Sequence, residues 1–226
     1  MIKTCLFDLD GTLLDTLDTI KYYINDTASR MGLPMISREQ ARIFVGKGAS
    51  NLVDRVFESY GIDIAIPKNR ATRDEFFRDY VDTYDASPFY LTHPYDGIPE
   101  LVGALRAKGI RLAVISNKPD PTVKQLIVDN FGDAFDIVEG AMVGVPLKPD
   151  PRAPLSICAR LGVSPEETAY IGDTGTDMKT GKAYGAALNI GVSWGFRDVP
   201  ELAANGATHI VNTPAEILAL LENANG

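Results

Sequence analysis

Short apolar runs alternate with segments of helical periodicity over most of the chain. The runs that predict buried strands are residues 2–7, 111–116, 135–138, 169–172, 187–192 and 209–211. Helices are predicted from Pro99 to a stop at Gly109, over 121–131, 151–161 and 176–184, and after Thr213. Ser164 and Glu167 form a capping-box pair that predicts one short helical turn. Apolar strands that alternate with helices are typical of a parallel sheet covered on both faces, so the pattern predicts a doubly wound α/β domain.

Residues 15–89 follow a different pattern. Leu17, Ile20, Ile24, Ala28 and Met31 recur at helical spacing, Ser37 with Gln40 opens a second helix, and two more amphipathic stretches cover 52–60 and 76–84. No strand-like run interrupts them. We therefore expect a core domain made of 1–14 and 90–226, with a helical cap domain at 15–89. A helical insertion directly after the first strand is expected to lie over the carboxyl edge of the sheet as a lid.

Composition narrows the classes of partner. The 226 residues are 45% hydrophobic and 23% charged, which is ordinary for a folded globular protein. The 22 basic and 30 acidic residues give a net charge of −8, and no run of Lys or Arg stands out. Nucleic acid and anionic membranes are therefore not expected partners. A chain this acidic that handles an anion needs a locally positive site.

Several features indicate a cytoplasmic protein. The apolar runs are far shorter than the ~20 residues that span a bilayer, and Met1 leads directly into a strand without a signal peptide. Cys5 and Cys158 lie far apart in apolar segments, which favours two buried free thiols over a disulfide. With two histidines and no Cys pair, a zinc site lacks a plausible ligand set, so carboxylates would hold any metal.

Polar residues follow three of the predicted strands. Asp8 and Asp10 follow the first, Ser116 ends the second, and Asp173 and Asp177 follow a third. Because parallel strands end along one edge of a sheet, these side chains are expected to converge. Four carboxylates in one crevice repel one another unless a divalent cation lies among them. With a hydroxyl and a lysine added, the set has the groups that bind a phosphate.

Lys148, in the proline-rich segment LKPDP, is the lysine that we expect to complete this site, whereas Lys118 is expected to be solvated. Simpler structural interpretations remain open for these residues. Asp8 and Asp10 are also compatible with a turn in which they accept hydrogen bonds from the local backbone. Lys148 is also compatible with a solvated loop.

Four motifs carry a family resemblance, namely FDLDGT at 7–12, SNK at 116–118, the lysine of LKPDP, and GDTGTD at 172–177. In this order they resemble a haloacid dehalogenase superfamily phosphatase, specifically the phosphoglycolate phosphatase group with a helical cap. The cap segment 42–49, RIFVGKGA, is similar to the Gly-rich specificity loop of that group.

The resemblance implies a mechanism. Asp8 would attack phosphorus and form an aspartyl phosphate, and Asp10 would protonate the leaving group and then deprotonate water. Mg²⁺ would be held by Asp8, Asp173 and the backbone carbonyl of Asp10, with Asp177 orienting these ligands. The residues implied to bind the phosphate or the rest of the substrate are Ser116, Lys148, Gly11, Thr12 and Asn117, helped by backbone amides near Leu9 and Asp10.

Substrate choice is expected to come from the cap. Gly46 and Lys47 are candidate substrate-binding residues, and we hypothesise that Lys47 binds the carboxylate of 2-phosphoglycolate. The alternative is a helix-breaking turn with a solvated lysine. Trp194 and Phe196 either line the mouth of the crevice or serve ordinary packing.

The presence of Asp10 helps to distinguish this function from those of related enzymes. Dehalogenases lack an acid at this place and phosphonatases replace it, so both are disfavoured. A β-phosphoglucomutase-like transferase and a pyrophosphatase or nucleotidase stay open as alternatives on this scaffold. Two alternatives come from other classes. The helical insertion argues against a phospho-aspartate receiver, and the complete motifs argue against a non-catalytic binding protein. The expected partner is a small phosphate ester, and both monomer and homodimer are compatible with the sequence.

Overall fold

The computed structural model describes residues 1–225 and contains two compact units. One unit comprises residues 1–15 and, among the described residues, 93–225; the other comprises Thr16–Thr92. The first holds a six-stranded sheet, and the second holds helices.

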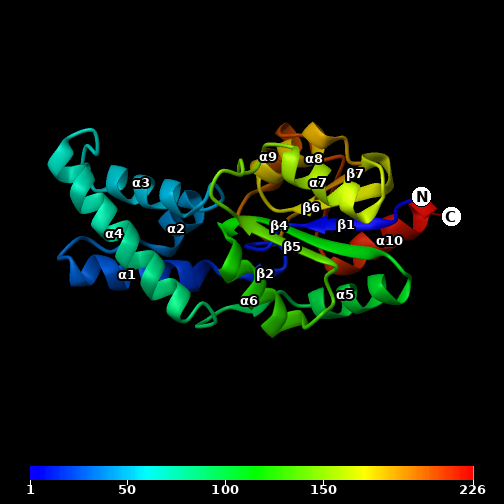
Figure 1. Cartoon of the computed structure of the whole chain (residues 1–226), viewed down its shortest axis with the longest axis horizontal. Helices are drawn as coiled ribbons and strands as arrows, with labels where there is room; N and C mark the ends of the chain where they lie inside the picture. Colours follow the sequence, from blue (N-terminus) through cyan, green and yellow to red (C-terminus); the bar gives the residue numbers. More distant parts are fainter. Residues whose placement is uncertain (226) are drawn as a thin grey trace. The chain divides into compact units, whose positions relative to one another are not determined.

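The sheet of the first unit is parallel throughout and has the order β5-β4-β1-β6-β7-β8 (Figure 1). The strands are β1 (Thr4–Phe7), β4 (Arg111–Pro119), β5 (Ile137–Ala141), β6 (Thr168–Gly172), β7 (Leu188–Val192) and β8 (His209–Val211). The central strand is β1, where Phe7 lies beside Val114 of β4 and Ile171 of β6. The predicted doubly wound α/β fold is confirmed.

Helices cover both faces of this sheet (Figure 1). One face packs on α5 (Ile98–Ala107), α6 (Asp120–Phe131) and α10 (Pro214–Asn225), and the other on α7 (Arg152–Leu161), α8 (Gly175–Tyr184) and α9 (Val199–Ala204). The alternation of strand side chains produces two cores. Phe7 belongs to the core with Leu105 of α5, whereas Leu6 belongs to the core with Ile157 of α7.

Three features of the first unit were not predicted. The two-residue strands β2 (Leu14–Asp15) and β3 (His93–Pro94) form an antiparallel pair, β4 continues through the polar residues to Pro119, and α9 is an additional short helix. Strand β5 lies at 137–141 rather than 135–138. These segments are too short or too polar to show an apolar period. The short turn η1 (Pro165–Glu167) has the predicted capping box.

The second unit consists of α1 (Leu17–Arg30), α2 (Arg38–Phe44), α3 (Ala49–Ser59) and α4 (Pro67–Ala86). Ser37 and Gln40 form the predicted capping box at the start of α2. The core of this unit contains the edge-to-face pair Phe57 and Phe76, with ring centroids 5.5 Å apart. Arg73 of α4 is also buried and pairs with Asp54.

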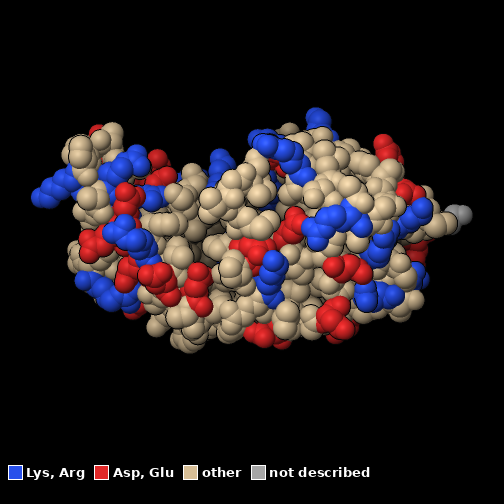
Figure 2. Space-filling view, in the orientation of Figure 1, with Lys and Arg blue, Asp and Glu red and all other residues tan. Residues whose placement is uncertain are grey.

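Surface charge and thiol state fit the sequence analysis. Lys and Arg are interspersed with Asp and Glu over the face drawn in Figure 2. Cys5 and Cys158 are both buried and free, as predicted. Among residues 1–225, none of the helices combines the length and the apolar character that crossing a membrane requires.

Candidate active site

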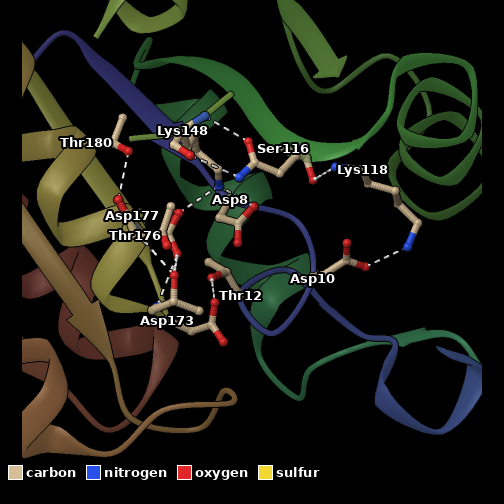
Figure 3. Close-up of polar contacts among 12 residues, drawn as sticks. Asp8, Asp10, Thr12, Ser116, Lys118, Lys148, Asp173, Thr176, Asp177 and Thr180 are labelled. Carbon is tan, nitrogen blue, oxygen red and sulfur yellow. Dashed lines mark hydrogen bonds and ion pairs between the residues drawn. The ribbon is translucent and has the colours of Figure 1, made fainter. Parts of the chain in front are cut away.

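Three carboxylates meet at the carboxyl edge of the sheet. Asp8 follows β1, Asp173 follows β6, and Asp177 lies in the first turn of α8 (Figure 3). One oxygen from each side chain lies within 4.8 Å of the others, and all three residues are buried. The sequence-predicted convergence of these three acids is therefore seen in the structure.

Lys148 compensates part of their charge. Its Nζ atom lies 2.8 Å from Oδ1 of Asp8 and 2.7 Å from Oδ1 of Asp177, and the residue is only 8% exposed. Contact with two carboxylates raises the pKa of Lys148 well above its ordinary value, against the opposing effect of burial. Lys148 is a buried cation of the site and not a solvated loop lysine.

Lys148 compensates only part of the negative charge of the three carboxylates. Burial is the largest cause that raises the pKa of Asp8 from 3.8 to about 7, and the charge of Asp177 adds to it. The same two causes raise the pKa of Asp173 well above its ordinary value. When all three acids are ionised, Lys148 leaves two formal negative charges unmatched by an ion pair within residues 1–225. A buried set of oxygen ligands with this charge fits a hard divalent cation such as Mg²⁺.

Asp173 is held by the two loops that flank it. The amide of Phe196, after β7, donates to Oδ2 at 2.7 Å, and the hydroxyl of Thr12 donates to Oδ1 at 3.3 Å. A Cβ atom on Gly11 would lie 2.2 Å from Oδ2 of Asp173, and one on Gly195 would lie 2.3 Å from its Cβ. Both glycines are therefore required for the backbone to approach the carboxylate this closely.

Asp177 owes its position to a helix cap. Thr174 is the N-cap residue of α8, and its hydroxyl and amide donate to Oδ2 of Asp177 at 2.6 Å and 3.1 Å. The amide of Asp177 returns a hydrogen bond to the Thr174 hydroxyl. This capping box turns Oδ1 toward Lys148 and the buried Tyr170 hydroxyl, which lies 3.4 Å away.

Two expectations from the sequence are corrected here. The carboxylate of Asp10 does not join the other three, since it points away from them toward Lys118 (Figure 3). Lys118 is not solvated: its Nζ atom lies 2.9 Å from Oδ1 of Asp10, and its side chain is 8% exposed. The backbone of β4 continues past Ser116 and carries Lys118 into the site, which a reading of the strand as ending at 116 missed.

Ser116 and two backbone amides offer hydrogen-bond donors. Ser116 is buried, and its Oγ accepts from the amide of Lys118 at 3.2 Å, so its own proton stays available. The amides of Leu9 and Asp10 have no acceptor among residues 1–225, although the Asp8 amide donates to Ile171. Unpaired amides at a strand end are suited to an anion.

Asn117 has a role that the sequence analysis did not foresee. Its Oδ1 accepts from the amide of Lys148 at 2.9 Å, and its Nδ2 donates to the Lys148 carbonyl at 3.3 Å. These bonds hold the loop that presents Lys148. Contact between Asn117 and a substrate stays a prediction, as it does for Gly11 and Thr12, which lie against Asp173.

The remaining candidates have different surroundings. Gly46 and Lys47 lie in the helical unit between α2 and α3; Lys47 is exposed, and Gly46 has a φ of 109°. Phe196 is buried, and the indole of Trp194 donates to the Thr12 carbonyl at 3.1 Å. The amide of Phe196 is a functional group that sequence reasoning missed, because backbone donors leave no residue-type signal.

Comparison with known proteins identifies the family to which the chain belongs. Residues 5–189 match the family model for haloacid dehalogenase-like hydrolases. A Pseudomonas aeruginosa N-acetylmuramic acid 6-phosphate phosphatase is 31% identical, over 99% of this chain and 96% of the relative. A Rhodospirillum rubrum phosphoglycolate phosphatase is also 31% identical, over 96% of this chain and 90% of the relative.

A solved structure of similar sequence has the same fold. The crystal structure of a phosphoglycolate phosphatase candidate from Lactobacillus delbrueckii superposes with a TM-score of 0.87 at 30% identity, over 95% of this chain and 96% of that one. The fold and the match to the family model thus define a hydrolase. The chain belongs to the haloacid dehalogenase-like hydrolase family and, like these relatives, is a phosphatase.

Proposed function

We propose that this protein is a Mg²⁺-dependent phosphomonoester hydrolase that works through an aspartyl phosphate on Asp8. The observation that carries the proposal is the buried contact of Lys148 with Asp8 and Asp177, beside Asp173 and the unpaired amides of Leu9 and Asp10. A phosphate dianion and a carboxylate nucleophile need such charge compensation in order to approach each other.

In the first step an oxygen of Asp8 forms a bond to phosphorus while the bond from phosphorus to the ester oxygen breaks. The carboxyl proton of Asp10 passes to the leaving alkoxide. In the second step a water oxygen bonds to phosphorus, Asp10 takes its proton, and the bond from phosphorus to Asp8 breaks. Asp8 is regenerated and inorganic phosphate leaves. Ser116, Lys148 and the two amides hold the non-bridging oxygens.

Asp8, Asp173 and the backbone carbonyl of Asp10 would hold Mg²⁺, with Asp177 orienting the site. When bound, the ion neutralises negative charge on the phosphoryl oxygens. The raised pKa of Asp8 supports this assignment, since a nucleophile must be ionised and a cation among these acids favours the ionised form.

The substrate class that we favour is a small phosphorylated carboxylic acid, such as 2-phosphoglycolate. The names of two 31% identical relatives support it, because phosphoglycolate and N-acetylmuramic acid 6-phosphate both carry a carboxylate beside a phosphate ester. The second of these compounds is the alternative substrate. We further propose that residues 15–89 act as the specificity cap and that the enzyme works in the cytoplasm, as a monomer or homodimer.

A panel of phosphate esters tests the activity. It contains both carboxylated esters, sugar phosphates, nucleoside monophosphates, pyrophosphate and p-nitrophenyl phosphate, each assayed with Mg²⁺ and with chelator. We expect many turnovers with Mg²⁺ and a loss of several orders of magnitude in Asp8→Asn, whose circular dichroism should stay unchanged. Release of the leaving alcohol or p-nitrophenol that stops near one equivalent per protein, with the phosphoryl group kept on Asp8, would instead indicate a phospho-aspartate receiver.

Lys47 provides the specificity test. Lys47→Ala should lower kcat/KM on the carboxylated esters far more than on p-nitrophenyl phosphate, because only the former carry a carboxylate that can pair with this exposed cation. Lys68→Ala, which removes another exposed lysine of the helical unit, is the matched control and should change neither value. Equal losses on both kinds of ester in Lys47→Ala would exclude carboxylate recognition by Lys47.

A further inference from the structure

The ion pair between Lys118 and Asp10 is the feature of the site that the proposed chemistry does not use. Lys118 Nζ lies 2.9 Å from Oδ1 of Asp10, and the two side chains are 8% and 20% exposed. Oδ2 of Asp10 has no hydrogen-bond partner in the described part of the chain, residues 1–225. One oxygen of this carboxylate is therefore anchored, and the other is left to exchange a proton.

The position of Lys118 is itself fixed by the fold. Its amide donates to Oγ of Ser116 at 3.2 Å, which ties it to a predicted phosphate-binding residue. The pairing of β4 with β5 shifts register between Ile115 and Pro119, the segment that carries both residues. Such irregularities beside active sites re-aim side chains away from the regular alternation of a strand. The register shift thus accounts for a lysine that reaches the loop after β1.

We propose that Lys118 is a positioning residue for Asp10: it holds the carboxylate apart from Asp8, Asp173 and Asp177 and aims Oδ2 for proton transfer to the leaving group. The inference rests on the proposed function, in which Asp10 is the acid and base. Its physical basis is orientation, because a carboxylate held by one oxygen keeps the other at a constant place, and small misplacements of a catalytic group cost large factors in rate.

The dependence on the leaving group tests this role. An alkyl phosphate needs a proton on its leaving oxygen, whereas p-nitrophenolate leaves without one. In Lys118→Met we expect kcat/KM for the best alkyl ester of the panel to fall by about tenfold or more, which is part of the ~10²–10⁴-fold that acid catalysis contributes, and kcat/KM for p-nitrophenyl phosphate to fall by less than about threefold. Lys118→Arg can still pair with Asp10. Its ratio of kcat/KM for the alkyl ester to kcat/KM for p-nitrophenyl phosphate should therefore stay closer to that of the parent protein. If Lys118→Met does not fold, the ratio is read from Lys118→Gln.

Asp10→Asn separates the acid role of Asp10 from the positioning role of Lys118. It should shift the ratio of alkyl to aryl kcat/KM at least as far as Lys118→Met, and the double variant Lys118→Met with Asp10→Asn should shift it no further. An unchanged ratio in Asp10→Asn would reject the acid role of Asp10 in the proposed function. A shifted ratio in Asp10→Asn with an unchanged one in Lys118→Met would reject only the inference on Lys118. Equal rises in KM on both esters in Lys118→Met, with kcat kept, would also overturn it, because they would indicate a lysine that binds phosphate.

Discussion

The backbone amide of Phe196 donates a 2.7 Å hydrogen bond to Oδ2 of Asp173, although the two residues lie 23 positions apart. This bond connects the loop after β7 with the loop after β6 and fixes one carboxylate of the site. The neighbouring residue Gly195 makes this bond possible. It lets the backbone of the loop after β7 pass so close to Asp173 that no side chain would fit at position 195. The segment SWGF at 193–196 therefore acts on the site through its backbone.

Gly195→Ala should weaken the binding of divalent metal. The added Cβ would lie 2.3 Å from Cβ of Asp173 and 2.4 Å from the Gly11 carbonyl oxygen, so at least one of the three loops that carry these residues must move. We expect a loss of metal affinity of about tenfold or more, in line with changes to groups that orient metal ligands. Titration calorimetry with Mg²⁺ measures it independently of activity.

Gly103→Ala is the matched control for this substitution. A Cβ at Gly103 meets nothing within 4 Å, and the residue lies inside α5, so the change should raise stability by about 0.5–1 kcal/mol and leave Mg²⁺ affinity unchanged. A Gly195→Ala protein with the metal affinity of Gly103→Ala would show that the close approach is not needed to place Asp173.

Lys148→Met should damage both activity and stability. It removes the cation that Asp8 and Asp177 share, and breaking a buried pair in this way typically costs about 3–5 kcal/mol. Chemical denaturation at neutral pH measures the loss. Lys124→Met is the control, because Lys124 pairs with Asp120 at 2.7 Å but is 54% exposed, so its removal should cost at most about 1 kcal/mol. Similar losses in the two variants would contradict the assignment of Lys148 as the compensating cation.

Asn117→Ala distinguishes positioning from substrate contact. The substitution deprives the buried amide of Lys148 of its acceptor, which should cost about 1–3 kcal/mol and lower kcat on every ester by a similar factor. A rise in KM on particular esters at unchanged stability would instead support the substrate-binding role that the sequence motif suggests.

The fold could be predicted to a large extent because its strands are apolar on both sides. Runs such as 169–172 and 187–192 are long enough to identify buried parallel strands, and the topology then brings Asp8 and Asp173 to one edge. The capping boxes that begin at Ser37 and Ser164 could also be predicted, since they depend on residue type at fixed spacing.

The directions of side chains could not be predicted in the same way. Periodicity places Asp10 at the correct edge, but its carboxylate turns away from Asp8, Asp173 and Asp177 because β4 runs on to Pro119 and brings Lys118 beside it. The amide of Phe196 was missed for a related reason. A backbone donor has no residue type, and its function depends on a contact with a residue far away in the chain.

The pH dependence of stability provides a further prediction. Burial and the neighbouring Asp177 raise the pKa of Asp8 from 3.8 to about 7, so the folded protein holds a proton that the unfolded chain has lost. The stabilisation from this group is complete below the unfolded pKa and is lost as pH rises through the folded one. In chelator, the free energy of unfolding attributable to Asp8 should therefore decline between about pH 4 and pH 7, with a limiting slope of about 1.4 kcal/mol per pH unit.

Mg²⁺ should reverse this decline, because a cation favours ionised carboxylates. Thermal unfolding with and without Mg²⁺ should show a larger increase in Tm at about pH 8 than at about pH 5. Asp8→Asn removes the titrating group, so its free energy of unfolding in chelator should fall less steeply over this interval than that of the parent protein. Asp173, whose pKa is also raised, should leave some residual slope in this variant. An increase in Tm that is the same at both pH values would argue against a metal site made of these buried acids.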